Sequence, residues 1–466
     1  MPECERKRRQ DAARIKMMKK HIVVIGGGMA GTAAAYMLVG RGYDVTIIEK
    51  DDRLGGRMRS EVSGNIAIEM GAGFITNAYT NVRAFLASTG LGVQLYGQRG
   101  SSGILRGGKV AVVNPGTILG GGVLSWRAKL RAVAVLMTVL IGWRQLDFQE
   151  PWRAAKYDTQ SVAELLRGRA GNELLERVVQ PILNSYFYWS PERTSAAVLL
   201  VIGKAMLRGG TYKLRGGLQQ IPQRAAEGSR TLIGHAVTRV QRNPTGVYDV
   251  TVEHEGKLRK LQADGVVCAT TASVVSKIIP DLSDRQQAFF SSVEYSSTVV
   301  VAQTFKKEQA RGTQGLAFPR KEGSAVAVVT VSPEPDTLGR GPKLSVVKIY
   351  ASGAEGALLC RQPDKAIITT LTAAMAPVRK AVLYEGAKPI STYVQRWHEA
   401  LPIFEAGRAK QLEAFMNGEV EDPNHALVFA GDYIGGPFIE GAFTSGVMAA
   451  DRLEQRISGA NKRSSV

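Results

Sequence analysis

The stretch HIVVIGGGMAGTAAAYMLVGRGYDVTIIEK, residues 21–50, decides the fold. It opens with a short run, 21–25, that is apolar on both faces and therefore predicts a buried parallel strand. A glycine-rich turn, a helix over 29–40 and a second strand over 45–48 follow. This order of elements is the nucleotide-binding unit of doubly wound α/β proteins. We therefore predict an α/β protein built around a Rossmann-type domain.

Three glycines of the turn, Gly26, Gly28 and Gly31, match the pattern G-x-G-x-x-G. The first permits the tight turn, the second lets a pyrophosphate approach the backbone, and the third lets the helix pack on the strand. Met29 and Ala30 open the helix, so their free N–H groups and the positive end of the helix dipole would face the phosphates.

Glu49 ends the second strand, 18 positions after Gly31, which is close to the spacing of the acid that binds ribose hydroxyls. A carboxylate accepts hydrogen bonds from a 2′-OH and repels a 2′-phosphate, so NADP is disfavoured, whereas NAD and FAD both fit. The next residue, Lys50, belongs to the same predicted contact region.

The segment DDRLGGRMRS, residues 51–60, follows directly. It resembles the L-G-G-R signature of the flavin-containing amine oxidase superfamily, which also includes protoporphyrinogen oxidases and phytoene desaturases. The resemblance implies that the cofactor is FAD and that Gly55, Gly56 and Arg57 lie beside its phosphates and ring. Two glycines allow a close backbone approach, and arginine offers a planar fork of donors to phosphate.

Two distant segments extend the resemblance. GHAVTRVQ, residues 234–241, resembles the superfamily's third FAD segment and implies that the Val237 backbone meets the adenine. LVFAGDYIGGPFIEGAFTSGVMAADRL, residues 427–453, resembles the closing motif, in which a Gly-Asp pair binds pyrophosphate or ribityl hydroxyls and a helix begins beside the flavin. The remaining implied cofactor contacts are Gly71, Ala72, Trp397, Gly431, Asp432, Glu440, Gly441 and Ala442. The closing motif holds no cysteine or histidine that could anchor the ring, so we expect noncovalent FAD.

A chain of 466 residues predicts more than one domain. We expect a discontinuous FAD-binding domain made of residues 19–74, 213–275 and 426–459. Residues 75–212 and 276–425 would form an inserted α+β substrate domain, mainly helical in its first part and rich in strands in its second. The basic segment before the first strand and the tail from 458 onward are expected to be disordered.

Candidates for the substrate side are aromatic. Trp397 matches the W-x(4)-P segment of the relatives, which implies a place beside the flavin. Tyr188 lies in NSYFYWSPERTS, which either lines an apolar tunnel or anchors the core. Amine oxidases usually frame the flavin with an aromatic pair, for which the closing segment offers Tyr433 or Phe438. Many also use a lysine to hold a water near the flavin N5, and the candidates are Lys204, Lys213 and Lys306, of which Lys204 is expected to reach outward to solvent.

The formal net charge of +19 indicates a negatively charged binding partner. No nucleic-acid motif is present, and a membrane surface fits better. The apolar run AVAVLMTVLIGW, residues 132–143, is preceded by Arg127, Lys129 and Arg131 and followed by Arg144. It is shorter than the ~20 residues that span a bilayer, so it is either a core helix or an interfacial segment. We expect a cytoplasmic protein that contacts a membrane peripherally through 127–144.

Four functions compete, and the intact Gly55-Gly56-Arg57 and Gly431-Asp432 argue against one of them, a non-enzymatic carrier that shares the fold but has lost the flavin. The first is an FAD-dependent oxidase or dehydrogenase that removes hydride from a small lipophilic substrate, such as a porphyrinogen, a carotenoid precursor or a polyprenyl compound. Its electrons would pass to O2 or a quinone. The alternatives are an amine oxidase acting on a soluble amine and a redox-neutral flavin isomerase. A strongly positive protein attracts cationic amines poorly, which favours the first. The spacing of the five histidines and three cysteines predicts no metal site.

Overall fold

The structure is a computed structural model that describes residues 19–463, except 99, 114–116, 118, 119, 122, 148, 170, 313 and 337–342. The predicted N-terminal tail therefore lies almost entirely outside the described residues. Among the helices of the described chain, none is both long enough and apolar enough to cross a membrane.

A five-stranded parallel sheet carries the nucleotide-binding unit. Its strands, in spatial order, are β10 (Arg230–Ile233), β2 (Asp44–Glu49), β1 (His21–Ile25), β14 (Gly265–Cys268) and β20 (Leu427–Phe429). Alternate residues of β1 serve two cores: Ile22 and Val24 pack with α2 (Met29–Gly40) and α18 (Ile439–Arg463), whereas Val23 and Ile25 face the opposite layer. This double burial explains the continuous apolar run in the sequence.

The helices α2 and α18 pack closely because of a glycine. A Cβ placed on Gly446 of α18 would lie 2.1 Å from the Ala30 carbonyl oxygen of α2. Helix α18 also continues to Arg463, beyond residue 458, so the prediction of a disordered tail from 458 was wrong for 458–463. That segment contains no proline, so the helix is free to continue.

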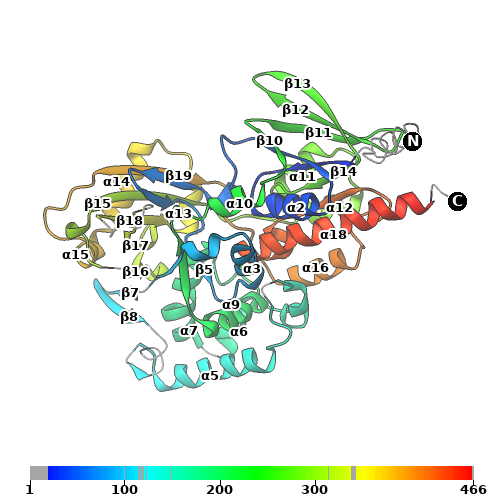
Figure 1. Cartoon of the computed structure of the whole chain (residues 1–466). Coiled ribbons are helices and arrows are strands. Elements are labelled where there is room, and N and C mark those ends of the chain that lie inside the picture. The colour runs from blue at the N-terminus through cyan, green and yellow to red at the C-terminus, as the bar shows by residue number, and fades with distance from the viewer. Residues whose placement is uncertain are drawn as a thin grey trace, which may run out of the picture.

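A second, seven-stranded sheet has the order β19-β15-β18-β17-β16-β7-β8, with all neighbours antiparallel except β16 and β7. Its strands are β7 (Ser101–Arg106), β8 (Lys109–Val113), β15 (Thr298–Lys306), β16 (Gln314–Ala317), β17 (Val326–Glu334), β18 (Leu344–Ala351) and β19 (Ser391–Trp397). Helices α13 (Gly353–Leu359), α14 (Asp364–Ala374) and α15 (Arg379–Val382) lie beside it (Figure 1). Since β7 and β8 precede residue 212, the two predicted inserts contribute to one sheet.

Helices gather at the other end of the same region (Figure 1). They are α5 (Trp126–Ile141), α6 (Val162–Arg169), α7 (Gly171–Leu174), α8 (Gln180–Phe187) and α9 (Ala196–Arg208), with the 3-10 helix η3 (Pro151–Tyr157). Smaller helices are α3 (Thr80–Ser88), α10 (Gln220–Ala225), α11 (Ala272–Ile278), α12 (Asp284–Ser291), α16 (Arg408–Met416) and α17 (Asp432–Gly435). Figure 1 places α5 along the lower edge of the molecule.

Three small sheets complete the fold. They are β11 (Ala236–Arg242) with β12 (Tyr248–His254) and β13 (Lys257–Ala263), β3 (Ser60–Ser63) with β4 (Ile66–Glu69), and β5 (Ile75–Thr76) with β9 (Thr211–Leu214) and β6 (Leu95–Gly97). The β11–β13 sheet projects from the side of the molecule opposite α5 (Figure 1).

Candidate cofactor site and adjoining cavity

The three glycines of the first turn have three different surroundings. Gly26 has a φ of +101°, and a Cβ there would lie 2.8 Å from the Ala269 carbonyl oxygen. A Cβ on Gly31 would lie only 1.9 Å from the Gly26 carbonyl oxygen. A Cβ on Gly28, by contrast, would meet no atom within 4 Å. The protein's own packing therefore requires the first and third glycines, whereas the second leaves open space at the start of a helix.

That open space faces the N-terminus of α2. Gly28 is the N-cap residue and supplies no side-chain cap, and the first turn of α2 carries no acid. The buried residues Met29 and Ala30 begin the helix. Backbone N–H groups in the first helical turn have no partner within the helix and favour an anion. The geometry thus fits a phosphate group, and the phosphate contact itself stays a prediction.

Glu49 is buried at the end of β2. Its Oε2 accepts a 2.6 Å hydrogen bond from the Gly27 amide, and its Oε1 accepts a 2.9 Å bond from the Asp51 amide. Burial raises the pKa of this carboxyl, and the two amide hydrogen bonds oppose that rise. The carboxylate therefore fastens the strand end to the glycine turn, and its remaining lone pairs suit ribose hydroxyls.

The L-G-G-R turn lies against the first glycine turn. The Gly55 amide donates to the Gly27 carbonyl at 2.9 Å, and a Cβ on Gly56 would come 3.4 Å from the Gly28 Cα. The next residue, Arg57, forms a two-pronged ion pair with Asp432, at 2.8 Å to Oδ2 and 2.9 Å to Oδ1. Motif residues 375 positions apart are thereby brought together.

The predicted contacts Gly71 and Ala72 adjoin Arg57 as well. The Ala72 amide donates to the Arg57 carbonyl oxygen at 2.9 Å, and a Cβ on Gly71 would lie 2.0 Å from that same oxygen. Trp397 closes this side, because its Nε1 donates to the Met70 carbonyl at 2.8 Å. Trp397 also lines a cleft of about 300 Å³ together with Gly56 and Leu54.

The remaining predicted contacts divide by location. The His235 amide donates to the Glu49 carbonyl at 2.9 Å, which brings the start of β11 and Val237 toward the adenosine end. Lys50 is exposed at the end of β2. At the other end, Gly441 packs against Gly435, whose carbonyl oxygen would lie 2.3 Å from a Cβ on Gly441.

Glu440 is fully buried, and its carboxylate accepts hydrogen bonds from the amides of Asn81 at 2.7 Å and Val82 at 2.9 Å. These amides begin α3, so the Glu440 side chain ties α3 to α18. Glu440 and Ala442 would therefore contact a cofactor through their backbone groups in the first turn of α18.

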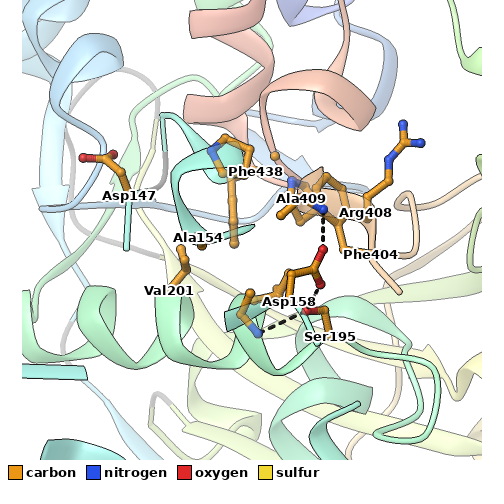
Figure 2. A pocket seen from close by; sticks show the side chains of 14 residues that line it. Asp147, Ala154, Asp158, Ser195, Val201, Phe404, Arg408, Ala409 and Phe438 are labelled. Carbon is orange, nitrogen blue, oxygen red and sulfur yellow. Dashed lines mark hydrogen bonds between the residues drawn. The ribbon is translucent and has the colours of Figure 1, made fainter. Parts of the chain in front are cut away.

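A small cavity adjoins the loop of the closing motif (Figure 2). Gly436, Pro437 and Phe438 line it on one side, and Val198 and Val201 of α9 on another. The other lining residues are Asp147, Pro151, Ala154, Asp158, Ser195, Ala197, Phe404, Arg408 and Ala409.

The polar groups of this cavity are bonded to one another or to the wall. Asp158 is buried and accepts hydrogen bonds from the Ser195 hydroxyl and, at 2.6 Å, from the Ala409 amide (Figure 2). Arg408 donates to the Tyr433 carbonyl at 3.1 Å and to Gln411 at 2.8 Å, and burial lowers the pKa of its guanidinium to about 10. The surface left for a ligand is therefore mainly apolar.

The aromatic candidates lie in different places. Phe438 lines the cavity and packs edge-on against Phe187, with ring centroids 5.7 Å apart. Tyr433 is fully buried, packs against Phe290 and does not line this cavity, and its place beside the flavin stays a prediction. Tyr188 stacks on Tyr350 at 6.5 Å instead of lining this cavity.

The lysine candidates are largely excluded by their partners. Lys204 is buried, and its Nζ donates to the carbonyls of Trp143 at 2.8 Å and Leu146 at 2.6 Å, so the prediction that it reaches solvent was wrong. The backbone carbonyls of Trp143 and Leu146, which follow α5 in the sequence, accept hydrogen bonds from the ammonium group and keep it in the interior. Lys213 pairs with Glu334 in the interior, and Lys306 is exposed.

Sequence reasoning missed Lys348. This lysine is buried on β18, donates from Nζ to the Glu69 carbonyl at 3.2 Å, and lies 3.9 Å from the position of a Cβ on Gly73. The only signal in the sequence is one cation inside the apolar strand LSVVKIYA, residues 344–351. No group of metal-ligating side chains is found among the described residues.

Comparisons with known proteins identify the family of this chain. A model of the family "Flavin containing amine oxidoreductase" matches residues 29–453. Over 93% of both chains, the protein is 22% identical to protoporphyrinogen oxidase 2 of Arabidopsis thaliana. It is 23% identical to coproporphyrinogen III oxidase of Bacillus subtilis, over 91% of this chain and 94% of the relative. The structure of putrescine oxidase bound to putrescine has a TM-score of 0.74 at 19% identity, over 94% of this chain and 100% of that one.

The chain belongs to the flavin-containing amine oxidoreductase family and is an FAD-dependent oxidoreductase. The geometry fits that cofactor. Gly28 leaves a cradle that a Cβ would fill, an uncapped helix N-terminus faces it, and Glu49 and the Arg57–Asp432 pair flank it with a carboxylate and a guanidinium.

Proposed function

We propose that the protein is an oxidase or dehydrogenase that removes hydride from a lipophilic substrate of the porphyrinogen, carotenoid-precursor or polyprenyl type. Noncovalently bound FAD would accept the hydride, and O2 or a quinone would reoxidise it. The parallel sheet with residues 19–74, 213–275 and 426–459 would form a Rossmann-type FAD-binding domain, and 75–212 with 276–425 the substrate domain.

One observation carries the proposal: the cavity beside the closing loop offers an apolar surface. Phe404, Phe438 and Val201 supply it, while Asp158 is engaged by donors of the wall. The apolar body of such a substrate would lose little by entering this cavity, whereas an ammonium ion would have to give up its water.

The names of the relatives support the same substrate class. Protoporphyrinogen oxidase and coproporphyrinogen III oxidase both act on porphyrinogens, and each aligns with more than nine-tenths of this chain. Porphyrinogens are therefore the first substrates to test.

A soluble amine is the second candidate. Putrescine oxidase shares the fold, and Asp147 and Asp158 both line the cavity. Against this reading, Asp158 is hydrogen-bonded within the wall, and the Asp147 carboxylate points away from Phe438 (Figure 2). The strongly positive protein also repels cations at long range.

The test is anaerobic reduction of the purified flavoprotein. We expect protoporphyrinogen or coproporphyrinogen to bleach the flavin absorbance, and putrescine to leave it unchanged. Phe438→Ala should slow bleaching, whereas Leu258→Ala on the remote strand β13 should not. Bleaching by putrescine alone would establish the amine oxidase, and a substrate that rearranges without bleaching would indicate an isomerase. Admitting air or a quinone afterwards identifies the electron acceptor.

Noncovalent attachment is tested separately. Acid precipitation should release the yellow flavin into the supernatant, because the closing motif contains no cysteine or histidine. Flavin that stays in the precipitate after washing would show a covalent bond.

A further inference from the structure

Helix α5 presents a bare apolar stripe. Its large exposed side chains are Trp126 (66%), Leu130 (61%), Val133 (42%), Met137 (48%), Leu140 (48%) and Ile141 (79%). The first five are spaced four, three, four and three residues apart, which places them along one face of the helix, and Ile141 follows Leu140 directly. The opposite face is occupied, since Ala128 and Val139 are buried against the protein.

The stripe is bordered by positive charge. Arg127, Arg131 and Arg144 are exposed, and the helix contains no acidic residue. The Arg127 guanidinium lies over the Trp126 ring, 5.4 Å from its centroid. An apolar face with tryptophan at one end and arginines along its margin is the arrangement of helices that lie in a membrane interface.

The helix is held firmly with this face outward. Ser125 caps its N-terminus, accepting from the Ala128 amide at 3.3 Å. At the other end, Lys204 of α9 fixes the turn after α5 through the Trp143 and Leu146 carbonyls. Figure 1 draws α5 at the lower edge of the molecule, and the exposed fractions of the stripe place its side chains in solvent.

We propose that the exposed face of α5 docks on an anionic lipid surface, with the stripe in the interface and the arginines on the head groups. Charge decides this against the alternative of a second copy of the chain. A two-fold contact between two such faces would bring the same arginines together without acidic partners in either helix. A membrane with anionic lipid supplies both the apolar layer and the opposite charge.

Docking would also place the cavity close to the lipid. Asp147 and Pro151, which follow α5 directly, line the cavity, as do Val198 and Val201 of the helix α9 that packs on α5. Access of a lipophilic substrate by this route rests on the proposed function, whereas the docking itself does not.

The experiment is co-sedimentation of the full-length flavoprotein with vesicles of phosphatidylcholine, with or without phosphatidylserine. We expect binding to the mixed vesicles that falls as salt is raised, because the charges are screened. Two triple variants separate the contributions: Leu130→Gln with Met137→Gln and Leu140→Gln, and Arg127→Gln with Arg131→Gln and Arg144→Gln. The second should weaken partitioning roughly 150-fold, at about 1 kcal/mol for each of the three arginines.

The matched control is Lys257→Gln with Arg259→Gln and Lys260→Gln, which removes the same charge from the exposed strand β13. It should bind like the unmodified protein. Equal weakening by this control, or no binding to the mixed vesicles, would overturn the proposal. So would dimerisation in sedimentation velocity that the leucine and methionine substitutions abolish. Flavin absorbance of each variant checks that it is folded, and substrate turnover is measured separately, so failure of either proposal is recognised independently.

Discussion

The cofactor cradle and the cavity beside it are built in opposite ways. At the cradle, backbone groups are left available: the N-terminus of α2 has no cap, and Gly28 faces open space. In the cavity, the polar groups of the wall are already hydrogen-bonded within the protein: Asp158 accepts hydrogen bonds from the Ser195 hydroxyl and the Ala409 amide. The first region is prepared to hold charge, and the second to exclude it.

This difference predicts which substitutions should weaken ligand binding without lowering the stability of the fold. Ligand contacts made by unused backbone groups can be lost without disturbing the fold. A satisfied wall cannot be altered without leaving a buried group unpaired, which costs about 1–3 kcal/mol.

The largest expected effects come from two glycines of one turn. Gly31→Ala should lower the free energy of unfolding by about 1–3 kcal/mol and abolish flavin binding, because its Cβ would collide with the Gly26 carbonyl at 1.9 Å. Gly28→Ala should leave stability within about 1 kcal/mol yet weaken flavin binding at least roughly tenfold, since an N-cap change is small. Denaturant unfolding of the apoprotein and flavin titration measure both. If Gly31→Ala and Gly28→Ala changed stability and flavin affinity equally, the contrast between the two glycines would be wrong.

Glu49→Ala comes next. The ribose hydroxyls would lose a charged acceptor worth roughly 1.5–3 kcal/mol, so the flavin dissociation constant should rise about 10- to 150-fold. Asp44→Ala removes the same charge from the exposed beginning of β2 and serves as the control. Full flavin occupancy with unchanged affinity in Glu49→Ala would show that the adenosine end lies elsewhere.

A smaller effect is expected from Glu69, a buried carboxyl whose partners are the Ser60 hydroxyl and the Leu218 amide, both at 2.7 Å. Burial raises its pKa to about 7, so the folded state binds the proton more tightly than the unfolded state. Its contribution to stability is present below the unfolded pKa near 4.5 and is lost as the pH rises through 7. Between pH 5 and pH 8, the stability of Glu69→Gln should fall less than that of the unmodified protein, by roughly 1–3 kcal/mol. Parallel stability–pH curves would contradict this.

The smallest effect is expected at Tyr433. Among the described residues, its buried hydroxyl has no hydrogen-bond partner, so Tyr433→Phe removes an unsatisfied group. Stability should stay the same or rise by up to about 1 kcal/mol, and the rate of flavin reduction should not change. The comparison is Phe438→Ala, which alters the cavity wall. A large loss of activity in Tyr433→Phe would place this ring at the substrate after all.

The sequence predicted the helix and glycine turns of the cradle well because their determinants are local. Helix α2 spans Met29–Gly40 as the pattern indicated, and the turns at Gly26 and Gly55 both have positive φ. The cavity escaped prediction because its walls come from side chains such as Asp158, Phe404 and Val201, which share no periodicity or spacing. For the same reason, the sequence did not reveal the buried Lys348 and wrongly predicted that Lys204 reaches solvent. The hydrogen-bond partners of a buried ammonium group are set by tertiary contacts, which the sequence pattern does not show.

The ion pair between Arg57 and Asp432 has a consequence for biosynthesis. At about 5–20 residues per second, the ribosome needs roughly 20–75 s to add the 375 residues that separate the two. During that time the glycine turns exist, but β20 and the closing loop do not. A nascent chain therefore cannot hold its flavin in the finished site, and loading must follow release of nearly the whole polypeptide. In flavin-starved cells, this enzyme should accumulate as a completed apoprotein and not as stalled fragments, and it should remain open to later rescue.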